Sequence, residues 1–330
     1  MDYVLRQGAA QLDVLSKSVP IEQALASGDL TEAQRQKLGR IVAARDFARD
    51  ELGLRVGRSF TLFHDTHGQP LSYNLSASKM DRLEPKRYWF PVIGWIDYIG
   101  YFDRADADSA EADLKSQGFD TYLRSVDAFS TLGYFPDPVH SPILERDELS
   151  LVETVIHELA HNTVYANGQS DFNESLATWI GRQGAIWYFQ RKSPDVPDAE
   201  TTLKQRYADE AQINDWLADA YQTLNTYYSG DASSDAKIAG REAVFVQIRE
   251  RFKSQTLPRL ALPSRYERWG DLPVNNALIL LNRRYNFDLS IFDRLFAKRG
   301  EDFAAFLADL KAAADSSDPW AHLRGVADGP

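Results

Sequence analysis

The chain has 330 residues, 44% of them apolar, and a formal net charge of −11. This length suits one large domain or two ordinary ones, and no run approaches the roughly 18 apolar residues of a membrane span. The acidic balance argues against nucleic acid and anionic membrane surfaces as partners. The absence of cysteine excludes disulfides and cysteine–zinc sites, so a zinc ion would need histidine and carboxylate ligands.

The first half of the chain is predicted to mix helices and strands. Apolar residues at helical spacing predict N-terminal helices within 1–57. Alternating apolar residues on both sides of a turn at 65–70 predict a β-hairpin over 58–75. The remaining elements expected before residue 147 are one or two strands in 87–102, a helix at 106–117, a strand at 120–126 and an edge strand at 128–134. Together, 58–146 predict a small, mainly antiparallel sheet region.

The second half is predicted to be almost entirely helical. Two helices, near 147–167 and 171–193, make up the segment 147–195, and a helical C-terminal part follows in 196–330. The helices expected there are 197–228, 233–254, 272–285, 289–298 and 300–314. The chain is therefore predicted to be α+β, mostly helical, and to form a single catalytic unit over 1–330.

The most informative stretch is His157-Glu158-Leu159-Ala160-His161. On a helix, residues four apart lie on one face, so both imidazoles can reach one metal ion. Glu158 lies about 100° further round the helix, where it can act on water without being a ligand. Metal binding resolves the cost of burying these polar groups in an apolar helix. The alternative is a pair of core histidines satisfied by hydrogen bonds.

Glu174 is the best candidate for a third ligand. Gly168 is a plausible end of the first helix, and Ser170 or Asp171 a plausible N-cap of the second. A second helix that folds back would carry Glu174 in its first turn, facing the histidines. Two histidines and one glutamate are an established ligand set for catalytic zinc. The alternative is an ordinary first-turn glutamate that stabilises the helix dipole. The remaining histidines are weaker candidates: His64, His67, His140 and His322.

Further motifs resemble a known family, the bacterial "predicted aminopeptidases", which are zinc-dependent metallopeptidases of the gluzincin type. The resemblance runs along most of the chain, and its motifs occur in the same order. They are Glu51–Leu54, Phe90–Gly94, Gly100–Asp103, Ser130–Pro138, His157–Tyr165, Phe172–Thr178 and Asn275–Ala277.

The resemblance implies a zincin-like catalytic domain, one zinc ion and hydrolysis of peptide bonds. It carries over His157, His161 and Glu174 as zinc ligands and Glu158 as the base that activates water. The spacer before Glu174 is shorter than in thermolysin-like enzymes, and Thr178 replaces an acidic residue that supports a histidine there. Glu153, one turn before His157, is a candidate replacement, its alternative being a solvated or capping role. Asn173 is a second candidate.

Other roles in catalysis have weaker sequence support. Tyr285 is the first choice for the donor that stabilises the oxyanion, ahead of Tyr221, Tyr227 and Tyr228, although each could be a core or surface tyrosine. The predicted edge strand would bind an extended peptide substrate through its main chain. The substrate-binding residues expected in it are Ser130, Thr131, Leu132 and Gly133, and the alternative is a loop with a tight turn. Asp97, Asp103 and Asp127 could hold a substrate N-terminus, or could be solvated or capping residues.

The sequence thus predicts a zinc metallopeptidase, with aminopeptidase action resting on the resemblance. The alternatives are a catalytically silent zincin that serves as a binding or scaffold module of the envelope, and a zinc amidase or endopeptidase acting on other peptide substrates. The intact Glu158 argues against the silent form. Residues 1–6 contain no apolar signal core, which taken literally indicates the cytoplasm. Family members usually carry a signal peptide, so the resemblance implies a periplasmic or envelope-associated protein. Nothing in the sequence sets the oligomeric state.

Overall fold

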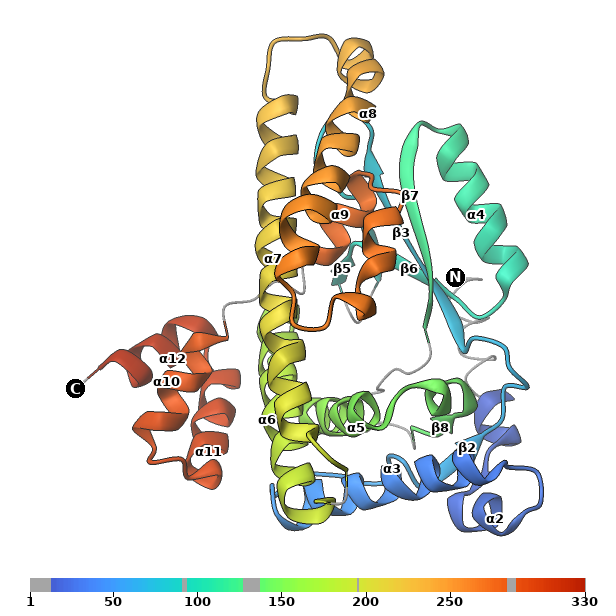
Figure 1. Cartoon of the computed structure of the whole chain (residues 1–330), viewed down its shortest axis with the longest axis vertical. Helices are drawn as coiled ribbons and strands as arrows, with labels where there is room; N and C mark the ends of the chain where they lie inside the picture. Colours follow the sequence, from blue (N-terminus) through green and yellow to red (C-terminus); the bar gives the residue numbers. More distant parts are fainter. Residues whose placement is uncertain (1–12, 91–93, 127–136, 195, 284–288, 330) are drawn as a thin grey trace. The chain divides into compact units, whose positions relative to one another are not determined.

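A computed structural model of the chain describes residues 13–90, 94–126, 137–194, 196–283 and 289–329. These residues form two compact units, each assembled from separate stretches of sequence (Figure 1). Unit 1 comprises residues 1–71, 126–200 and 287–330, and unit 2 comprises 72–125 and 201–286. Helices predominate over several small sheets, which confirms the predicted α+β class. No helix in the described ranges is long and apolar enough to cross a membrane.

The N-terminal helices of unit 1 are α2 (Ile21–Ala26) and α3 (Glu32–Asp50). A capping box starts α3: the Thr31 hydroxyl accepts from the backbone of Gln34, whose side chain accepts from the backbone N–H of Thr31. The buried positions of α3, among them Leu38 and Phe47, recur at helical spacing and form part of the core. This confirms the predicted helices of the N-terminal part.

The predicted hairpin over 58–75 is wrong. Its first strand became β2 (Leu62–His64), which lies in a three-stranded sheet between β1 (Val19–Pro20) and β8 (Val139–His140). It runs antiparallel to β1 and parallel to β8. Its second strand became β3 (Ser72–Lys79), which belongs to a different sheet. Both segments do form strands, as the alternation of apolar residues indicated, but each strand pairs with strands distant in sequence and not with the other.

The helical hairpin of α5 (Glu148–Thr163) and α6 (Ser170–Lys192) forms the centre of unit 1. α3 packs against α5. The C-terminal helices α10 (Ser290–Lys298), α11 (Phe303–Ala314) and α12 (Pro319–Asp328) belong to the same unit. Aromatic contacts join them to α6, as in the pairs Trp179–Phe306 and Phe172–Trp320. Helix α12 was not predicted from the sequence.

Unit 2 combines a sheet of order β6–β3–β7 with four helices. The sheet strands are β3, β6 (Tyr98–Tyr101) and β7 (Phe119–Val126), and β6 runs antiparallel to β3. The helices are α4 (Arg104–Ser116), α7 (Ala199–Tyr228), α8 (Ser234–Arg251) and α9 (Asn276–Arg283). Short 3-10 and π turns follow α8 between Phe252 and Asp271.

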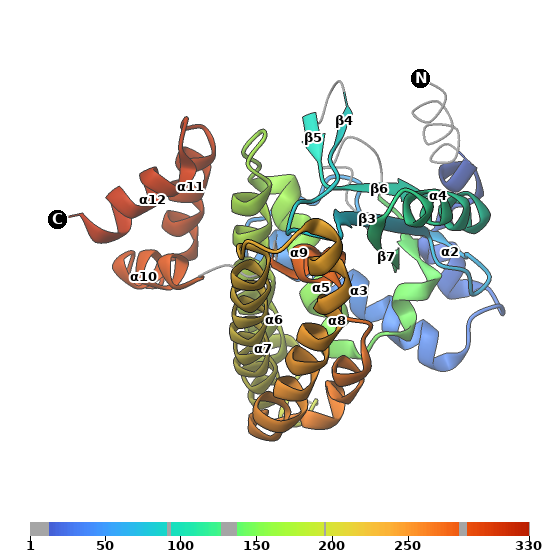
Figure 2. The ribbon, with the colours of Figure 1, turned by 90° about the horizontal axis from the view of Figure 1, so that it is seen from above.

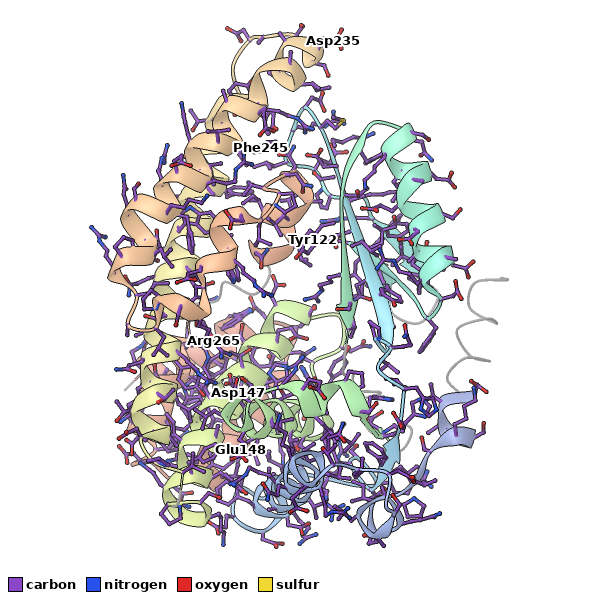
Figure 3. All side chains as sticks on the ribbon, turned by 45° about the vertical axis from the view of Figure 1, so that its right-hand side comes forward. Tyr122, Asp147, Glu148, Asp235, Phe245 and Arg265 are labelled. Atoms are coloured by element: carbon purple, nitrogen blue, oxygen red, sulfur yellow. The ribbon has the colours of Figure 1, made fainter. Side chains whose placement is uncertain are left out.

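Two apolar clusters stabilise unit 2. The larger one is built from the helical segments and includes Trp216, Phe245 and Phe252, and Tyr122 of β7 packs against it (Figure 3). The smaller one joins Leu75 and Ala77 of β3 with Leu114 of α4. The helix and the strand expected at 106–117 and 120–126 are thus confirmed as α4 and β7.

The aromatic segment 87–102, expected to give one or two strands, contains three. β4 (Tyr88–Phe90) and β5 (Gly94–Ile96) form an antiparallel two-stranded ribbon, and β6 joins the sheet of unit 2. The helices expected at 197–228, 233–254 and 272–285 correspond to α7, α8 and α9. The predicted edge strand at 128–134 lies outside the described residues.

Candidate metal centre

Helix α5 carries three of the proposed site residues: His157, Glu158 and His161. It begins at its N-cap Asp147, whose carboxylate accepts from the backbone N–H and the hydroxyl of Ser150 (Figure 3). Most of its apolar residues are fully buried, which fixes the rotation of the helix about its axis. The two histidines therefore lie on a face whose direction is set by the core.

The histidine side chains and Glu174 converge at one point. The Nε2 atoms of His157 and His161 lie 3.2 Å apart. One carboxylate oxygen of Glu174 lies 3.6 Å from Nε2 of His157, and the other lies 3.6 Å from Nε2 of His161. Within the described residues, these three form the one group of at least three histidine, aspartate or glutamate side chains that could hold a metal ion.

The spacing fits a tetrahedral metal ion. Bonds of about 2.0–2.2 Å to nitrogen and oxygen place neighbouring ligands roughly 3.3–3.6 Å apart at a tetrahedral centre. The two nitrogens, 3.2 Å apart, and the carboxylate, with a different oxygen 3.6 Å from each nitrogen, lie close to this range. The donor set is also the nitrogen and carboxylate mixture that zinc accepts, and three protein ligands leave a fourth position open. His157, His161 and Glu174 could therefore hold zinc.

Close contact between α5 and α6 brings Glu174 to the histidines. A Cβ at Gly181 would lie 3.1 Å from the Cβ of His157 and 3.1 Å from the carbonyl oxygen of Glu153. A Cβ at Gly184 would lie 2.8 Å from a methyl carbon of Ile156. Any larger residue at these positions would push the helices apart. The two glycines thus set the separation at which a carboxylate on α6 can share a site with imidazoles on α5.

Asn173 fixes the turn between the two helices through two hydrogen bonds to the backbone. Its side-chain oxygen accepts from the backbone N–H of Ala166, and its nitrogen donates to the carbonyl of the same residue, both at 2.8 Å. The side chain is buried. Because Glu174 is the next residue, this pair of bonds positions the start of α6. We therefore infer that Asn173 supports the backbone beside Glu174.

The predicted helix boundaries here need correction. The first helix ends at Thr163, with Val164 as its C-cap, and Gly168 lies in the connection with a positive φ of 74°. The second helix has Gln169 as its N-cap, without a side-chain capping bond, so neither Ser170 nor Asp171 caps it. The bonds from Asn173 to the connection take over the stabilising role that a capping side chain would have.

The two histidines differ in their electrostatic surroundings. Burial, reinforced by the neighbouring His157, lowers the pKa of His161 to about 4. Burial also disfavours the charged form of His157, but the carboxylates of Glu174, Glu158 and Glu153 outweigh it, so the pKa of His157 is raised. The Nδ1 atom of His161 is buried and has no hydrogen-bond partner among the described residues. A neutral imidazole with a free lone pair is the form that binds metal.

Glu158 lies in surroundings that disfavour its charge. Burial, followed by the carboxylates of Glu174 and Asp137, raises its pKa to about 6, against the opposing effects of His157 and Arg146. A carboxylate with a raised pKa is a stronger base, which suits proton transfer near neutral pH. Asp137 and Arg146 were not predicted from the sequence to be neighbours of Glu158. The one sequence feature that pointed to such a neighbour was Asp137 itself, which lies within the motif Ser130–Pro138.

Glu153 lies beside Arg182, with 4.0 Å between its carboxylate and the guanidinium Nε. Its carboxylate contributes to the raised pKa of His157, so it is electrostatically close to the site. The proposed oxyanion donor Tyr285 and the substrate residues Ser130, Thr131, Leu132 and Gly133 lie outside the described residues.

The alternative candidates have structural roles in unit 2. The hydroxyl of Tyr227 donates to the carbonyl of Lys237, and that of Tyr228 donates to the side chain of Asn276. Asp103 accepts from the backbone N–H of Asp106 as the N-cap of α4. Asp97 forms an ion pair with Arg87, with 3.2 Å between its carboxylate and the guanidinium Nε. Asp103 thus has the capping role that was one alternative to substrate binding, whereas the ion pair of Asp97 was not predicted.

A comparison with protein families adds an independent result. The family model described as "Putative aminopeptidase" matches residues 2–321. The chain belongs to this family. The description of the family indicates a peptidase acting on peptide substrates. Neither the curated proteins nor the solved structures give a match. The match covers both units, which agrees with the long series of motifs found in the sequence.

Proposed function

We propose that the protein is a zinc-dependent aminopeptidase in which His157, His161 and Glu174 hold one zinc ion. The observation that carries the proposal is the convergence of two imidazole nitrogens, 3.2 Å apart, and the carboxylate of Glu174, which has a different oxygen 3.6 Å from each nitrogen, beside a glutamate that is not among them. When bound, zinc supplies a Lewis acid that polarises the scissile carbonyl and makes water more acidic. Aminopeptidase action, as opposed to internal cleavage, is supported by the family description.

The chain's own residues provide the proton transfers. Glu158, as a carboxylate, removes a proton from the attacking water and then donates it to the leaving amine, so the base is regenerated with each cycle. The cluster of Glu158, Glu174 and Asp137 carboxylates favours this transfer, because it raises the proton affinity of Glu158. Asn173 and the two glycines of α6 hold Glu174 in place while the proton moves.

The proposal is tested with the variant Glu158→Gln. Zinc should bind at about one equivalent per chain in both proteins, because Glu158 is not a ligand. Peptide cleavage should fall by about 100- to 10,000-fold, the usual contribution of a general base. The matched control is Glu148→Gln, which makes the same chemical change at the start of α5, where Glu148 pairs with Arg40. Cleavage by Glu158→Gln at the wild-type rate would overturn the assigned mechanism.

A digest of a peptide library, read by mass spectrometry, tests the kind of cleavage. Products that lose single residues from the N-terminus are expected. Internal cleavage would contradict the aminopeptidase assignment while leaving the zinc peptidase intact. Less than about half an equivalent of zinc after zinc is supplied would overturn the metal site itself.

A further inference from the structure

The β4–β5 ribbon of unit 2 exposes two tryptophans. Trp89 and Trp95 are 58% and 65% exposed, the highest values among the large apolar residues described. They lie directly opposite each other in the register of the ribbon, so they form one continuous surface. The ribbon projects from the β3–β6–β7 sheet of its unit (Figure 2). Exposed aromatic surface of this kind marks an interaction site.

A charge boundary lies at the foot of the ribbon. Arg87 and Asp97, which flank the two strands, form an ion pair with 3.2 Å between Nε and the carboxylate. Beyond them, the described strand residues carry no charge: they are Tyr88, Trp89, Phe90, Gly94, Trp95 and Ile96. The ribbon therefore has an apolar part that ends sharply at a polar base.

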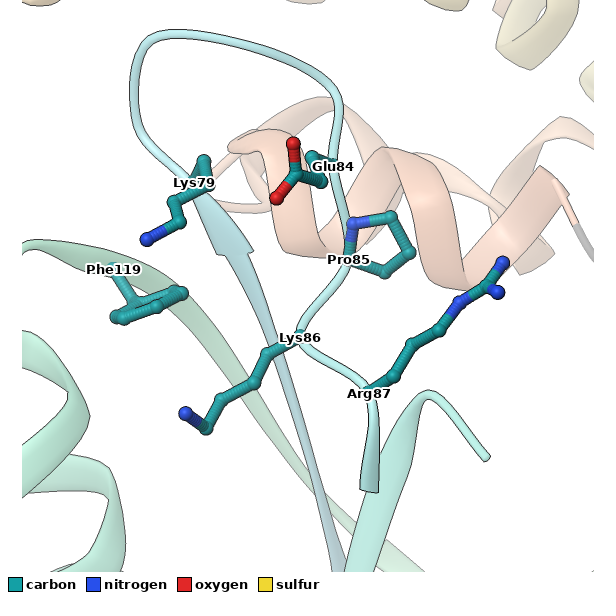
Figure 4. A pocket seen from close by; sticks show the side chains of 6 residues that line it. All are labelled: Lys79, Glu84, Pro85, Lys86, Arg87 and Phe119. Carbon is teal, nitrogen blue, oxygen red and sulfur yellow. The ribbon is translucent and has the colours of Figure 1, made fainter. Parts of the chain in front are cut away.

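A basic pocket adjoins this base. It has a volume of about 470 Å³ and is lined by Lys79, Glu84, Pro85, Lys86, Arg87 and Phe119 (Figure 4). The ammonium groups of Lys79 and Lys86 lie 4.4 Å and 5.0 Å from the centroid of the Phe119 ring. In the close view both lysines reach toward this ring, whereas Arg87 points to the other side of the chain.

The two lysines are the charged residues of the pocket that form no ion pair within 4 Å among the described residues. The carboxylate of Glu84 already pairs with Arg82 at 2.7 Å, and Arg87 pairs with Asp97. Neither Lys79 nor Lys86 has a carboxylate partner within 4 Å in the described part of the chain. The pocket thus presents two ammonium groups and an aromatic ring to solvent, an arrangement complementary to an anionic group.

We propose that the β4–β5 ribbon and the basic pocket at its foot form a docking surface for a lipid bilayer that contains anionic phospholipids. Tryptophan is the side chain most suited to the boundary between headgroups and acyl chains, since its ring is apolar and its N–H is polar. Pocket residues 84–87 directly precede β4 in sequence, so the pocket adjoins the ribbon and would meet headgroup phosphates as the tryptophans enter the interface. A soluble acidic peptide would explain the lysines but leave the paired tryptophans without a partner.

The net charge of −11 does not prevent this contact. Charges further away than the Debye length, about 8 Å at physiological ionic strength, are largely screened. The local lysines therefore decide the interaction once the ribbon reaches the surface. The acidic balance argues against anionic membrane surfaces only through the sum of the charges, whereas their positions decide a local contact.

Sedimentation with lipid vesicles tests the proposal on the full chain. Vesicles of phosphatidylcholine with about 30% phosphatidylglycerol should bind the wild-type protein, and vesicles of pure phosphatidylcholine should bind it at least about tenfold more weakly. Trp89→Ala combined with Trp95→Ala should lower binding to the anionic vesicles by at least about tenfold. Lys79→Gln combined with Lys86→Gln should lower it by about tenfold and reduce its dependence on salt.

Matched variants control for charge and for apolar surface. Arg268→Gln with Lys311→Gln removes two positive charges at exposed positions elsewhere. Val246→Ser removes an apolar side chain that is 43% exposed. Both should bind vesicles within about twofold of wild type. Failure of the wild-type protein to bind anionic vesicles would overturn the proposal, as would equal losses in the controls. Lysine-dependent binding of an acidic peptide without vesicle binding would assign the pocket to a protein partner instead.

Discussion

The cluster of His157, His161 and Glu174 in unit 1 and that of Asp120, Arg241 and Asn276 in unit 2 both place polar groups inside the protein, but their contacts differ. In unit 2 the guanidinium of Arg241 donates twice to the carboxylate of Asp120, each bond 2.7 Å long. The same carboxylate accepts from the backbone N–H of Asn276. Every charge there has an opposite charge or a donor beside it.

The cluster of unit 1 is arranged differently. Two imidazole nitrogens face each other, and the half-buried carboxylate of Glu174 approaches both of them at a distance longer than a normal hydrogen bond. Two imidazoles and one carboxylate meet there, which is a donor set that zinc accepts. Burial alone therefore does not distinguish a structural network from a candidate binding site. The two clusters differ instead in the balance of their hydrogen-bond donors and acceptors.

Breaking the network of unit 2 should have the largest effect on stability. Asp120→Ala leaves the guanidinium of Arg241 buried without its partner, and we expect a loss of about 3–5 kcal/mol in the free energy of unfolding. Glu242→Ala, which removes the partner of Arg249 at an exposed position, is the control and should cost less than about 1 kcal/mol. Urea unfolding measures both. Zinc binding by the folded Asp120→Ala protein should equal that of wild type, and a lost zinc site would show that the two clusters are not independent.

Zinc should stabilise unit 1 by an intermediate amount. With free zinc at about 100 times its dissociation constant, we expect about 2.7 kcal/mol of added stability, because only the folded chain brings the three ligands together. His161→Ala should abolish this gain. His67→Ala is the matched control, since the imidazole of His67 is 87% exposed and pairs with Asp65 outside the cluster. Thermal unfolding with zinc and with a chelator provides the measurement. The same zinc response in His161→Ala would contradict the ligand assignment.

The close approach of α5 and α6 can be tested with Gly181→Ala. The new methyl group would meet the backbone of Glu153 and the Cβ of His157, neither of which can move easily, so we expect a loss of about 1–3 kcal/mol in stability. Zinc affinity should fall as well, because the shift moves Glu174 relative to the histidines. Gly39→Ala in α3 meets nothing within 4 Å and should stabilise the protein slightly. Normal zinc affinity in Gly181→Ala would show that this helix contact does not set the site.

The histidines His64 and His140 should have the smallest effect on the free energy of unfolding near neutral pH. Burial, and then the charge of His64, lowers the pKa of His140 to about 3, and burial lowers that of His64. The unfolded chain takes up these protons near pH 6.5, before the folded chain does, so stability is full above that pH and falls as the pH drops towards 3. Between pH 7 and pH 6 we expect a loss of about 0.7 kcal/mol from His140 alone.

Urea unfolding of the zinc-free protein at these two pH values measures this loss. The variant His140→Asn has no titrating group at this position, so its stability should change with pH by correspondingly less. An identical pH dependence of the two proteins would assign the acid sensitivity to other groups.

Local patterns in the sequence determined much of the candidate site. The pairing of His157 with His161 depends only on the four-residue spacing within one helix, and the core-facing residues of α5 were visible from their periodicity. The order of the helices was also predictable, although Glu174 lies beyond the expected first turn of α6, because the helix begins at Ser170. These features involve residues close in sequence, whose relative positions follow from helix geometry alone.

The tertiary structure decided what depends on distant partners. The strands predicted as one hairpin joined different sheets, because β2 pairs with β1 and β8, and β3 with β6. The approach of Glu174 to the histidines depends on the contact of Gly181 and Gly184 with α5, and the position of Glu174 depends on the bonds between Asn173 and Ala166. The pocket of Lys79, Lys86 and Phe119 joins residues up to forty positions apart. Such pairings result from competition among all apolar and polar surfaces of the chain, which periodicity within one segment does not encode.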